Sequence, residues 1–311
     1  MKVMESKATK KVRGARPNIH HLQFIIHNSY HRLQFIIHPL RRHNRRTVIA
    51  LAFILLQVVL AVGASWFAPY DPYRSDFTAT WQKPNAQHWC GTDDLGRDVF
   101  SRLLYGARIS LSVGVLSQLA AALVGLPVGA WAGLRGGRVD YIVMRVIDVL
   151  SSLPALLFYI LLMVSLGAGF GNMVLALAAT GWIGLARLVR GQVLTLKEMD
   201  YVRASRAMGG STRHIVTTHL LGNALSPVIV AFALGIPGAM LAEAGLSFLG
   251  LGVPPPHTSW GQMIGTYQIY LRTAWHLTVF PAVTLALTML AWFLLADGLR
   301  LALDPLAREE Q

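Results

Sequence analysis

Long runs without charged residues recur along the chain and are separated by short polar segments. A helix needs about 20 apolar residues to cross the hydrocarbon core of a membrane, and several runs reach that length. The run 149–186 is too long for one helix and is interrupted by glycines at 167–172, so it predicts two spans. We predict six membrane-spanning helices: 47–67, 109–134, two within 142–186, 227–249 and 277–296.

The distribution of basic residues predicts how these helices are oriented. Of the 28 Lys and Arg residues, 22 fall on the side that holds both termini and 6 fall on the other side. Cytoplasmic segments of membrane proteins carry the excess of Lys and Arg. We therefore expect an all-α membrane domain over 47–305, a basic cytoplasmic tail over 1–46 and a short cytoplasmic tail over 306–311.

Composition agrees with a membrane protein and excludes several functions. The chain is 54% hydrophobic and 14% charged, whereas a soluble domain carries about a quarter charged residues. We interpret the net charge of +13 as a signal of membrane topology, because most Lys and Arg residues fall on one side. The chain has no interleaved basic and aromatic patch of the kind that binds nucleic acid.

The sequence also lacks the common catalytic motifs. It has no glycine-rich loop ending in Gly-Lys-Ser or Gly-Lys-Thr, and neither His-Glu-x-x-His nor Gly-x-Ser-x-Gly occurs. Cys90 is the only cysteine, which excludes an internal disulfide, and we expect its thiol to be inert. We expect neither a metal nor a cofactor in this chain, so chemical energy must come from a partner.

The basic tail carries two further patterns. The segment LQFIIH occurs at 22–27 and again at 33–38, and this spacing would place both copies on one face of a helix. The repeat is either a helix on the inner membrane surface or a local duplication in a disordered tail. We favour the local duplication. Histidines at positions 20, 21, 27, 31, 38 and 43 lack nearby carboxylates or thiols, so a metal site is the weaker interpretation.

The segment 198–227, between the fourth and fifth predicted spans, has the pattern of two short helices. Asp200 is placed to cap the first helix and Ser211 to cap the second. Gly209 and Gly210 are placed to end the first helix. We expect a helical elbow that docks on another protein, with an ordinary interhelical loop as the alternative. The expected docking face consists of Tyr201, Ala204, Ser205 and Met208.

This elbow resembles the EAA loop of ABC importer permeases, the segment that forms the coupling helix and sits in a groove of the ATPase subunit. Arg203, Ala204 and Ser205 stand at the Glu-Ala-Ala positions. Gly209 is the signature glycine, and HLLGNALSP follows where the family usually has His-Ile-Leu-Pro-Asn-Ala-Leu-Pro-Pro. Arg203 replaces an acidic residue and Gly222 replaces a proline, so we expect different ionic contacts and a more flexible elbow.

Four other segments resemble one group of these permeases, the second permease subunit of the dipeptide, oligopeptide and nickel importers. The resemblance runs from about residue 48 to 305. It implies the type I importer fold in a bacterial or archaeal cell membrane, with 198–224 as the coupling loop. The segments are GTDDLGRDVFSRLLYGARISLSVG at 91–114, MRVIDVLSSLP at 144–154, AEAGLSFLGLGVPPPHTSWGQMI at 242–264 and DGLRLALDP at 297–305.

The resemblance also implies partners and cargo. The chain would pair with a homologous permease subunit, dock on two ATPase subunits that bind ATP and Mg²⁺, and receive cargo from an extracytoplasmic binding protein. Di- and oligopeptides are the expected cargo, with nickel, glutathione or opine-like conjugates as alternatives. A membrane enzyme using Asp148 and Glu243 and a stand-alone channel or proton-coupled carrier are alternatives of other classes. The elbow and the absence of an internal repeat argue against the carrier.

The segment 70–108 mixes both signs of charge with an apolar face. This pattern predicts a helix that lies along the outer surface and braces a gate. The charged residues that carry this pattern are Asp93, Asp94, Arg97, Asp98 and Arg102.

Ionisable residues within spans are costly and usually face a cavity or a partner. Arg145 and Asp148 are three residues apart, which predicts a structural ion pair. Glu243 has no basic neighbour within two turns, so we expect a hydrogen bond to another helix or a position in the pathway, where a peptide's amino terminus would suit it. The candidates for the pathway or gate are Glu243, Ser247 and Trp260, with an anchor at the membrane interface as the alternative for Trp260.

Overall fold

The computed structural model describes residues 45–216, 218 and 221–303. The tail with its repeat and its histidines lies outside the described residues. The described part is helical, with an isolated bridge between Thr92 and Asp98. Its helices are α3 (Arg45–Val62), α4 (Ala64–Phe67), α5 (Val99–Arg135), α6 (Gly137–Ser151), α7 (Ala155–Leu166), α8 (Phe170–Leu196), α9 (Asp200–Ala207), α10 (Thr212–Ile215), α11 (Leu221–Phe248), α12 (Trp260–Tyr267), η2 (Gln268–Tyr270) and α13 (His276–Leu303).

Within the described residues, five helices are long and apolar enough to cross a membrane. They are α3, α5, α8, α13 and the part of α11 from Gly222 to Phe248. A sixth crossing exists only if α6 and α7 count as one span, because these two helices meet at an angle of 83°. Pro154 lies between them, and proline has no backbone N–H to continue a helix. The third predicted span is therefore a broken pair of helices.

The second span starts earlier than the sequence predicted. α5 begins at Val99, where the Asp98 carboxylate accepts a hydrogen bond of 2.7 Å from the Ser101 N–H. The helix then continues through Pro127, which removes one backbone hydrogen bond without ending it. The prediction of a separate helix along the outer surface is wrong, because residues 99–108 are the first turns of a membrane-spanning helix.

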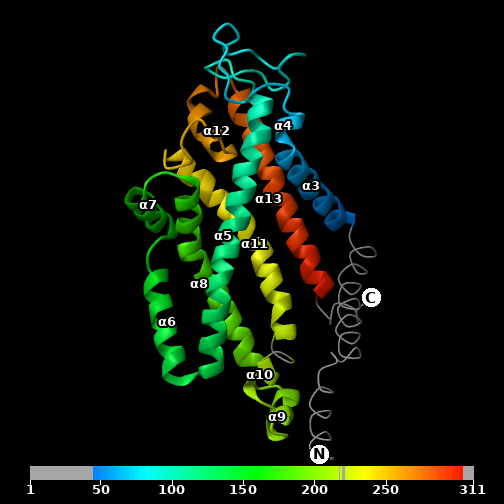
Figure 1. The fold of residues 1–311 in the computed structure, drawn as a ribbon, viewed down its shortest axis with the longest axis vertical. Helices are drawn as coiled ribbons and strands as arrows, with labels where there is room; N and C mark the ends of the chain where they lie inside the picture. The colour runs from blue at the N-terminus through cyan, green and yellow to red at the C-terminus, as the bar shows by residue number, and fades with distance from the viewer. Residues whose placement is uncertain (1–44, 217, 219–220, 304–311) are drawn as a thin grey trace, which may run out of the picture. The chain divides into compact units, whose positions relative to one another are not determined.

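A stripe of glycines joins α5 to α8, its neighbour in the bundle (Figure 1). Gly125, Gly129 and Gly133 recur every four residues, so they lie on one face of α5. A Cβ atom on Gly129 would overlap the Ala186 backbone, and one on Gly133 would meet the Val193 Cβ at 2.9 Å. Small residues allow close backbone packing, on which membrane helices depend because lipid removes the hydrophobic driving force between them.

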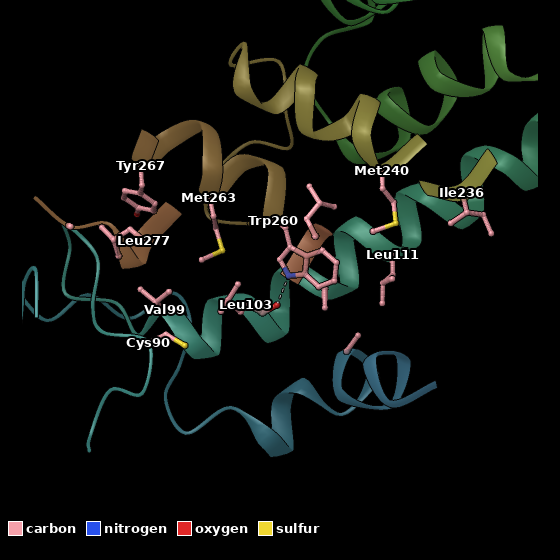
Figure 2. Packing of buried hydrophobic residues seen from close by; sticks show 14 residues of the cluster. Cys90, Val99, Leu103, Leu111, Ile236, Met240, Trp260, Met263, Tyr267 and Leu277 are labelled. Atoms are coloured by element: carbon pink, nitrogen blue, oxygen red, sulfur yellow. Dashed lines mark hydrogen bonds between the residues drawn. The ribbon is translucent and has the colours of Figure 1, made fainter. Parts of the chain in front are cut away.

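A buried hydrophobic cluster joins α5, α11, α12 and α13. It includes Trp260 and Met263 of α12, Leu103 of α5, Met240 of α11 and Leu277 of α13 (Figure 2). Each of these side chains is at most 8% exposed. The short helix α12 is therefore an integral part of the helix packing.

Most predicted site residues lie in two regions at opposite ends of the helices (Figure 1). The cap consists of the loop 69–98 together with α12. From here on the elbow means residues 198–216 of the predicted segment 198–227, which contain α9 and α10. The cap and the elbow are described in turn below.

Candidate functional site

Asp93 is the centre of a polar network in the cap. Its buried carboxylate accepts hydrogen bonds of 2.9 Å from the backbone N–H groups of Leu95 and Arg97 and one of 2.7 Å from the Arg97 Nε. The phenol of Tyr267, on α12, donates to it at 2.9 Å. Gly96 makes the tight turn possible, because its φ of +71° lies in the left-handed region that favours glycine. The loop therefore wraps around one carboxylate and links it to α12.

Asp98 connects the same loop to α5. Its carboxylate caps the helix and also lies 2.9 Å from the Nδ1 of His88. Arg102 is buried one turn into α5, with its Nε 3.6 Å from Asp93. Asp94 lies at the edge of the network, with its Oδ1 3.1 Å from the Tyr267 phenol oxygen, whose single proton is donated to Asp93. The predicted charged residues are thus brought together, in a buried network and not on an exposed helix.

Burial changes the ionisation of two groups in the cap. It raises the pKa of the Tyr267 phenol, and the negative charge of Asp93 raises this pKa further, so the phenol remains a hydrogen-bond donor. Burial also raises the pKa of the Cys90 thiol to about 11. Because the thiolate is the reactive form, the raised pKa favours the unreactive thiol of Cys90 at neutral pH.

Glu243 links α11 to α12. The side chain is fully buried, and its Oε1 accepts hydrogen bonds of 2.7 Å from Ser247 and 2.6 Å from Ser259. Ser259 also caps α12 by accepting a hydrogen bond of 3.0 Å from the Gln262 N–H. Glu243 therefore makes the predicted hydrogen bond to another element. Its side chain exposes no surface in this chain, and its Oε2 has no hydrogen-bond partner among the described residues.

Trp260 is a core residue, and its interpretation as an interfacial anchor is wrong. The side chain is 1% exposed, and its indole Nε1 donates a hydrogen bond of 3.0 Å to the Leu103 carbonyl on α5 (Figure 2). Its backbone N–H donates to the Ser110 Oγ at 3.1 Å. The segment 250–259 returns the chain onto α5, and this return cannot be seen in the local pattern of turn residues.

The elbow has the predicted two-helix form, with one cap in a different place. Gly209 follows α9 with a φ of +85°, and the Ser211 Oγ accepts a hydrogen bond of 3.2 Å from the His214 N–H at the start of α10. Asp200 does not cap α9, because it is the first helical residue and Met199 holds the N-cap position. An acidic side chain in the first turn still stabilises the helix through the helix dipole.

The predicted docking face of α9 is only partly on the surface. Met208 is 83% exposed and Tyr201 is 43% exposed, and Ala204 is exposed beside them. Ser205 is instead buried, and its carbonyl accepts a hydrogen bond of 2.9 Å from the Gly210 N–H. Ser205 therefore packs α9 against its own turn, while the other three residues present a surface.

The two departures from the family pattern have different structural outcomes. Arg203 forms an exposed ion pair of 2.7 Å with Glu198, and the hydrogen bond from Arg203 lowers the pKa of the Glu198 carboxyl. Glu198, within the elbow itself, is thus the acidic partner of Arg203, which stands at a position that is acidic in the family pattern. Gly222, which stands where the family has proline, lies in the first turn of α11, and the helix continues through it.

A polar cluster that the sequence reveals only in part joins α6 to α8. The predicted pair is present, with the Arg145 guanidinium 3.6 Å from Asp148. Arg187 of α8 also reaches Asp148, at 3.1 Å, and donates a hydrogen bond of 2.9 Å to the Ser151 Oγ. Sequence reasoning missed Arg187 because it lies 39 positions from Asp148, beyond any helical spacing.

Two family models of transport proteins match parts of the chain. A family model described as binding-protein-dependent transport system inner membrane component matches residues 125–309. A second model, described as the N-terminal TM domain of oligopeptide transport permease C, matches residues 42–84. The longer match includes the elbow, the broken pair α6–α7 and α12.

Curated relatives cover most of the chain. The dipeptide transport system permease protein DppC of Bacillus subtilis (strain 168) is 46% identical over 268 residues, which are 86% of this chain and 84% of the relative. The oligopeptide permease OppC of the same strain is 42% identical over 86% of this chain and 88% of the relative. The glutathione permease GsiD of Pectobacterium atrosepticum is 40% identical over 85% of this chain and 89% of the relative.

A solved structure has a similar fold. The inward-facing MetNI methionine ABC transporter matches with a TM-score of 0.56 and 20% identity, over 66% of this chain and 97% of that chain. At this identity the likeness concerns the fold alone.

Proposed function

The chain belongs to the family of binding-protein-dependent transport system inner membrane components, and from this premise we propose that it forms half of the pathway of an ABC importer for di- and oligopeptides. The observation that carries the cargo assignment is the similarity to the dipeptide and oligopeptide permeases, at 46% and 42% identity along 86% of the chain. A homologous permease subunit forms the other half, and an extracytoplasmic binding protein delivers the peptide.

The elbow is the attachment point for the ATPase subunits, which bind ATP and Mg²⁺ and hydrolyse the nucleotide. Its exposed residues Tyr201, Ala204 and Met208 supply an apolar contact surface beside the ion pair Arg203–Glu198. The positive-inside distribution of Lys and Arg supports a cytoplasmic position for the elbow and both termini. The cap then faces the binding protein.

Alternating access follows from these two attachments. ATP-driven closure of the partner subunits moves the elbows together, and the helix pairs tilt between inward-facing and outward-facing states. A lever must be rigid to transmit this motion. The Ser211 cap and the left-handed turn at Gly209 give the elbow a defined corner.

Glutathione import is the second candidate function. The observation in its favour is the 40% identity to the glutathione permease GsiD over 85% of this chain. Glutathione is itself a small peptide with free carboxylates, so the same pathway chemistry would serve both cargoes.

The experiment that tests the cargo measures uptake in cells that lack this chain and in cells where it is restored. Labelled dipeptide, labelled glutathione and ⁶³Ni²⁺ are supplied in parallel. We expect the restored chain to rescue dipeptide uptake. Rescue of nickel or glutathione alone would overturn the peptide assignment and leave the permease assignment intact.

A substitution in the elbow tests the coupling. Nothing lies within 4 Å of a Cβ atom built on Gly209, so the side chain of Gly209→Leu would project away from this chain and toward a docked ATPase. We expect this variant to insert in the membrane normally and to lose ATP-driven uptake. Undiminished uptake by Gly209→Leu would remove the elbow from the mechanism.

A further inference from the structure

A partly exposed cluster of charged side chains lies between α6 and α8, next to the end of the uncharged run 149–186. The Arg187 guanidinium is 3.1 Å from one oxygen of Asp148, and the Arg145 guanidinium is 3.6 Å from the other. The side chains of Arg187, Asp148 and Arg145 are 44%, 47% and 63% exposed. Water or a ligand can therefore reach all three charged groups.

The cluster carries an excess of positive charge. Two guanidinium groups share the single carboxylate of Asp148, and no second acidic side chain among the described residues pairs with either arginine. Arg145 also lies over the Tyr141 ring, 5.2 Å from its centre, a contact that leaves the charge in place. A planar anion such as a carboxylate matches the hydrogen-bonding fork of a guanidinium group.

The backbone next to the cluster is irregular and exposed. The break between α6 and α7 falls at residues 152–154, and Ser151, Ser152 and Pro154 are all exposed. Irregular backbone and charged side chains in membrane-spanning segments are tolerated where they line a water-filled cavity or contact protein. The break and the excess positive charge suit a position at the translocation pathway, whereas exposed apolar residues beside them, such as Val149 and Leu153, are suited to lipid or another subunit.

A second ion pair between the same two helices provides the contrast. Arg190 donates two hydrogen bonds to the two carboxylate oxygens of Asp140. These side chains are 30% and 15% exposed, less than those of the first cluster. One guanidinium group balances one carboxylate here, so this pair has the form of a structural link and no capacity for an anion.

We propose that Arg187 and Arg145 bind the carboxyl terminus of the cargo peptide as it leaves the pathway. This proposal rests on the proposed function and names the part of the chain that contacts the cargo. Asp148 competes with the peptide carboxylate for the two arginines, and removal of its charge leaves both guanidinium groups available.

The test compares four variants by the initial rate of uptake of a labelled dipeptide. Arg187→Gln and Asp148→Asn alter the proposed site, and Arg190→Gln and Asp140→Asn are the matched controls in the structural pair. Rates are normalised to the amount of chain in the membrane, measured by immunoblot. We expect about a tenfold loss for Arg187→Gln, because a charge-assisted hydrogen bond is lost, and less than about a twofold change for Asp148→Asn. The two control variants should resemble each other.

Three results would count against the proposal. Equal losses in Arg187→Gln and Asp148→Asn would identify a structural ion pair, as would undiminished uptake by Arg187→Gln. If the glutamine variant does not accumulate, Arg187→Lys replaces it, because lysine keeps the positive charge and lacks the guanidinium fork. We expect a loss larger than that of Asp148→Asn, and a loss no larger than that of Asp148→Asn would overturn the assignment. Failure of the unsubstituted chain to restore any peptide uptake is a distinct outcome, which removes the proposed function and its peptide site together.

Discussion

The cap and the elbow contain similar residue types but use them differently. In the cap, Asp93 and Asp98 are buried, and their carboxylates are satisfied by groups of the same chain. In the elbow, Arg203 and Glu198 pair at the surface, and Met208 is largely exposed. Loss of one partner in a buried network leaves an unpaired buried charge, whereas an exposed pair separates at little cost. The cap is therefore a fixed part of the chain, and the elbow is free to exchange contacts with another subunit.

The largest effect is expected when the central carboxylate of the cap is neutralised. Asp93→Asn removes the carboxylate that pairs with the buried Arg102 at 3.6 Å and with Arg97 at 2.7 Å, and it leaves Arg97 only the pair of 3.7 Å with Asp94. This loss should cost about 3–5 kcal/mol of folding free energy. The thermal unfolding midpoint of the purified chain in detergent measures this loss. Glu198→Gln is the matched control in the elbow, and because that ion pair is exposed it should leave the midpoint unchanged. Similar shifts of the unfolding midpoint in both variants would show that the ion pairs of the cap and the elbow contribute equally to stability.

Two glycines with similar backbone conformation make the comparison sharper. Gly96 in the cap and Gly209 in the elbow have φ values of +71° and +85°. A Cβ atom on Gly96 would overlap the Asp76 carbonyl, while nothing lies within 4 Å of one on Gly209. Gly209→Ala should therefore cost only the left-handed strain, about 1–2 kcal/mol. Gly96→Ala should lose a further 1–3 kcal/mol or so from overpacking.

Thermal unfolding of the two alanine variants, run side by side, measures the difference. A midpoint for Gly96→Ala that is no lower than that of Gly209→Ala would show that the cap loop accommodates a Cβ atom as readily as the elbow does.

The smallest expected difference concerns two helix caps. Ser259→Ala removes the cap of α12 and one of the two hydroxyl donors to the buried Glu243, for about 1–3 kcal/mol. Ser211→Ala removes an exposed cap of α10 alone, for about 0.5–1 kcal/mol. Midpoints from the same unfolding assay should rank the two variants in that order. A reversed ranking would mean that Glu243 gains nothing from Ser259.

Local patterns were sufficient to locate the five long helices, but not the start of α5 or the break between α6 and α7. Uncharged runs predicted the five long helices, because the apolar length of a span is a property of consecutive residues. Gly209, Ser211 and the pair Arg145–Asp148 were also predictable, since turn, cap and helix-face contacts act over one or two turns. The coupling loop and the family motifs lie in such short segments.

Contacts between distant segments could not be predicted from the local pattern of residues. Tyr267 reaches Asp93 across 174 positions, and Arg187 reaches Asp148 across 39. The burial of Trp260 likewise depends on where the chain returns after residue 259. By itself, the sequence of this protein determined its spans, its elbow and its family resemblance. Only the tertiary structure decided which charges are buried and which are exposed, because burial depends on what long-range packing places around a residue.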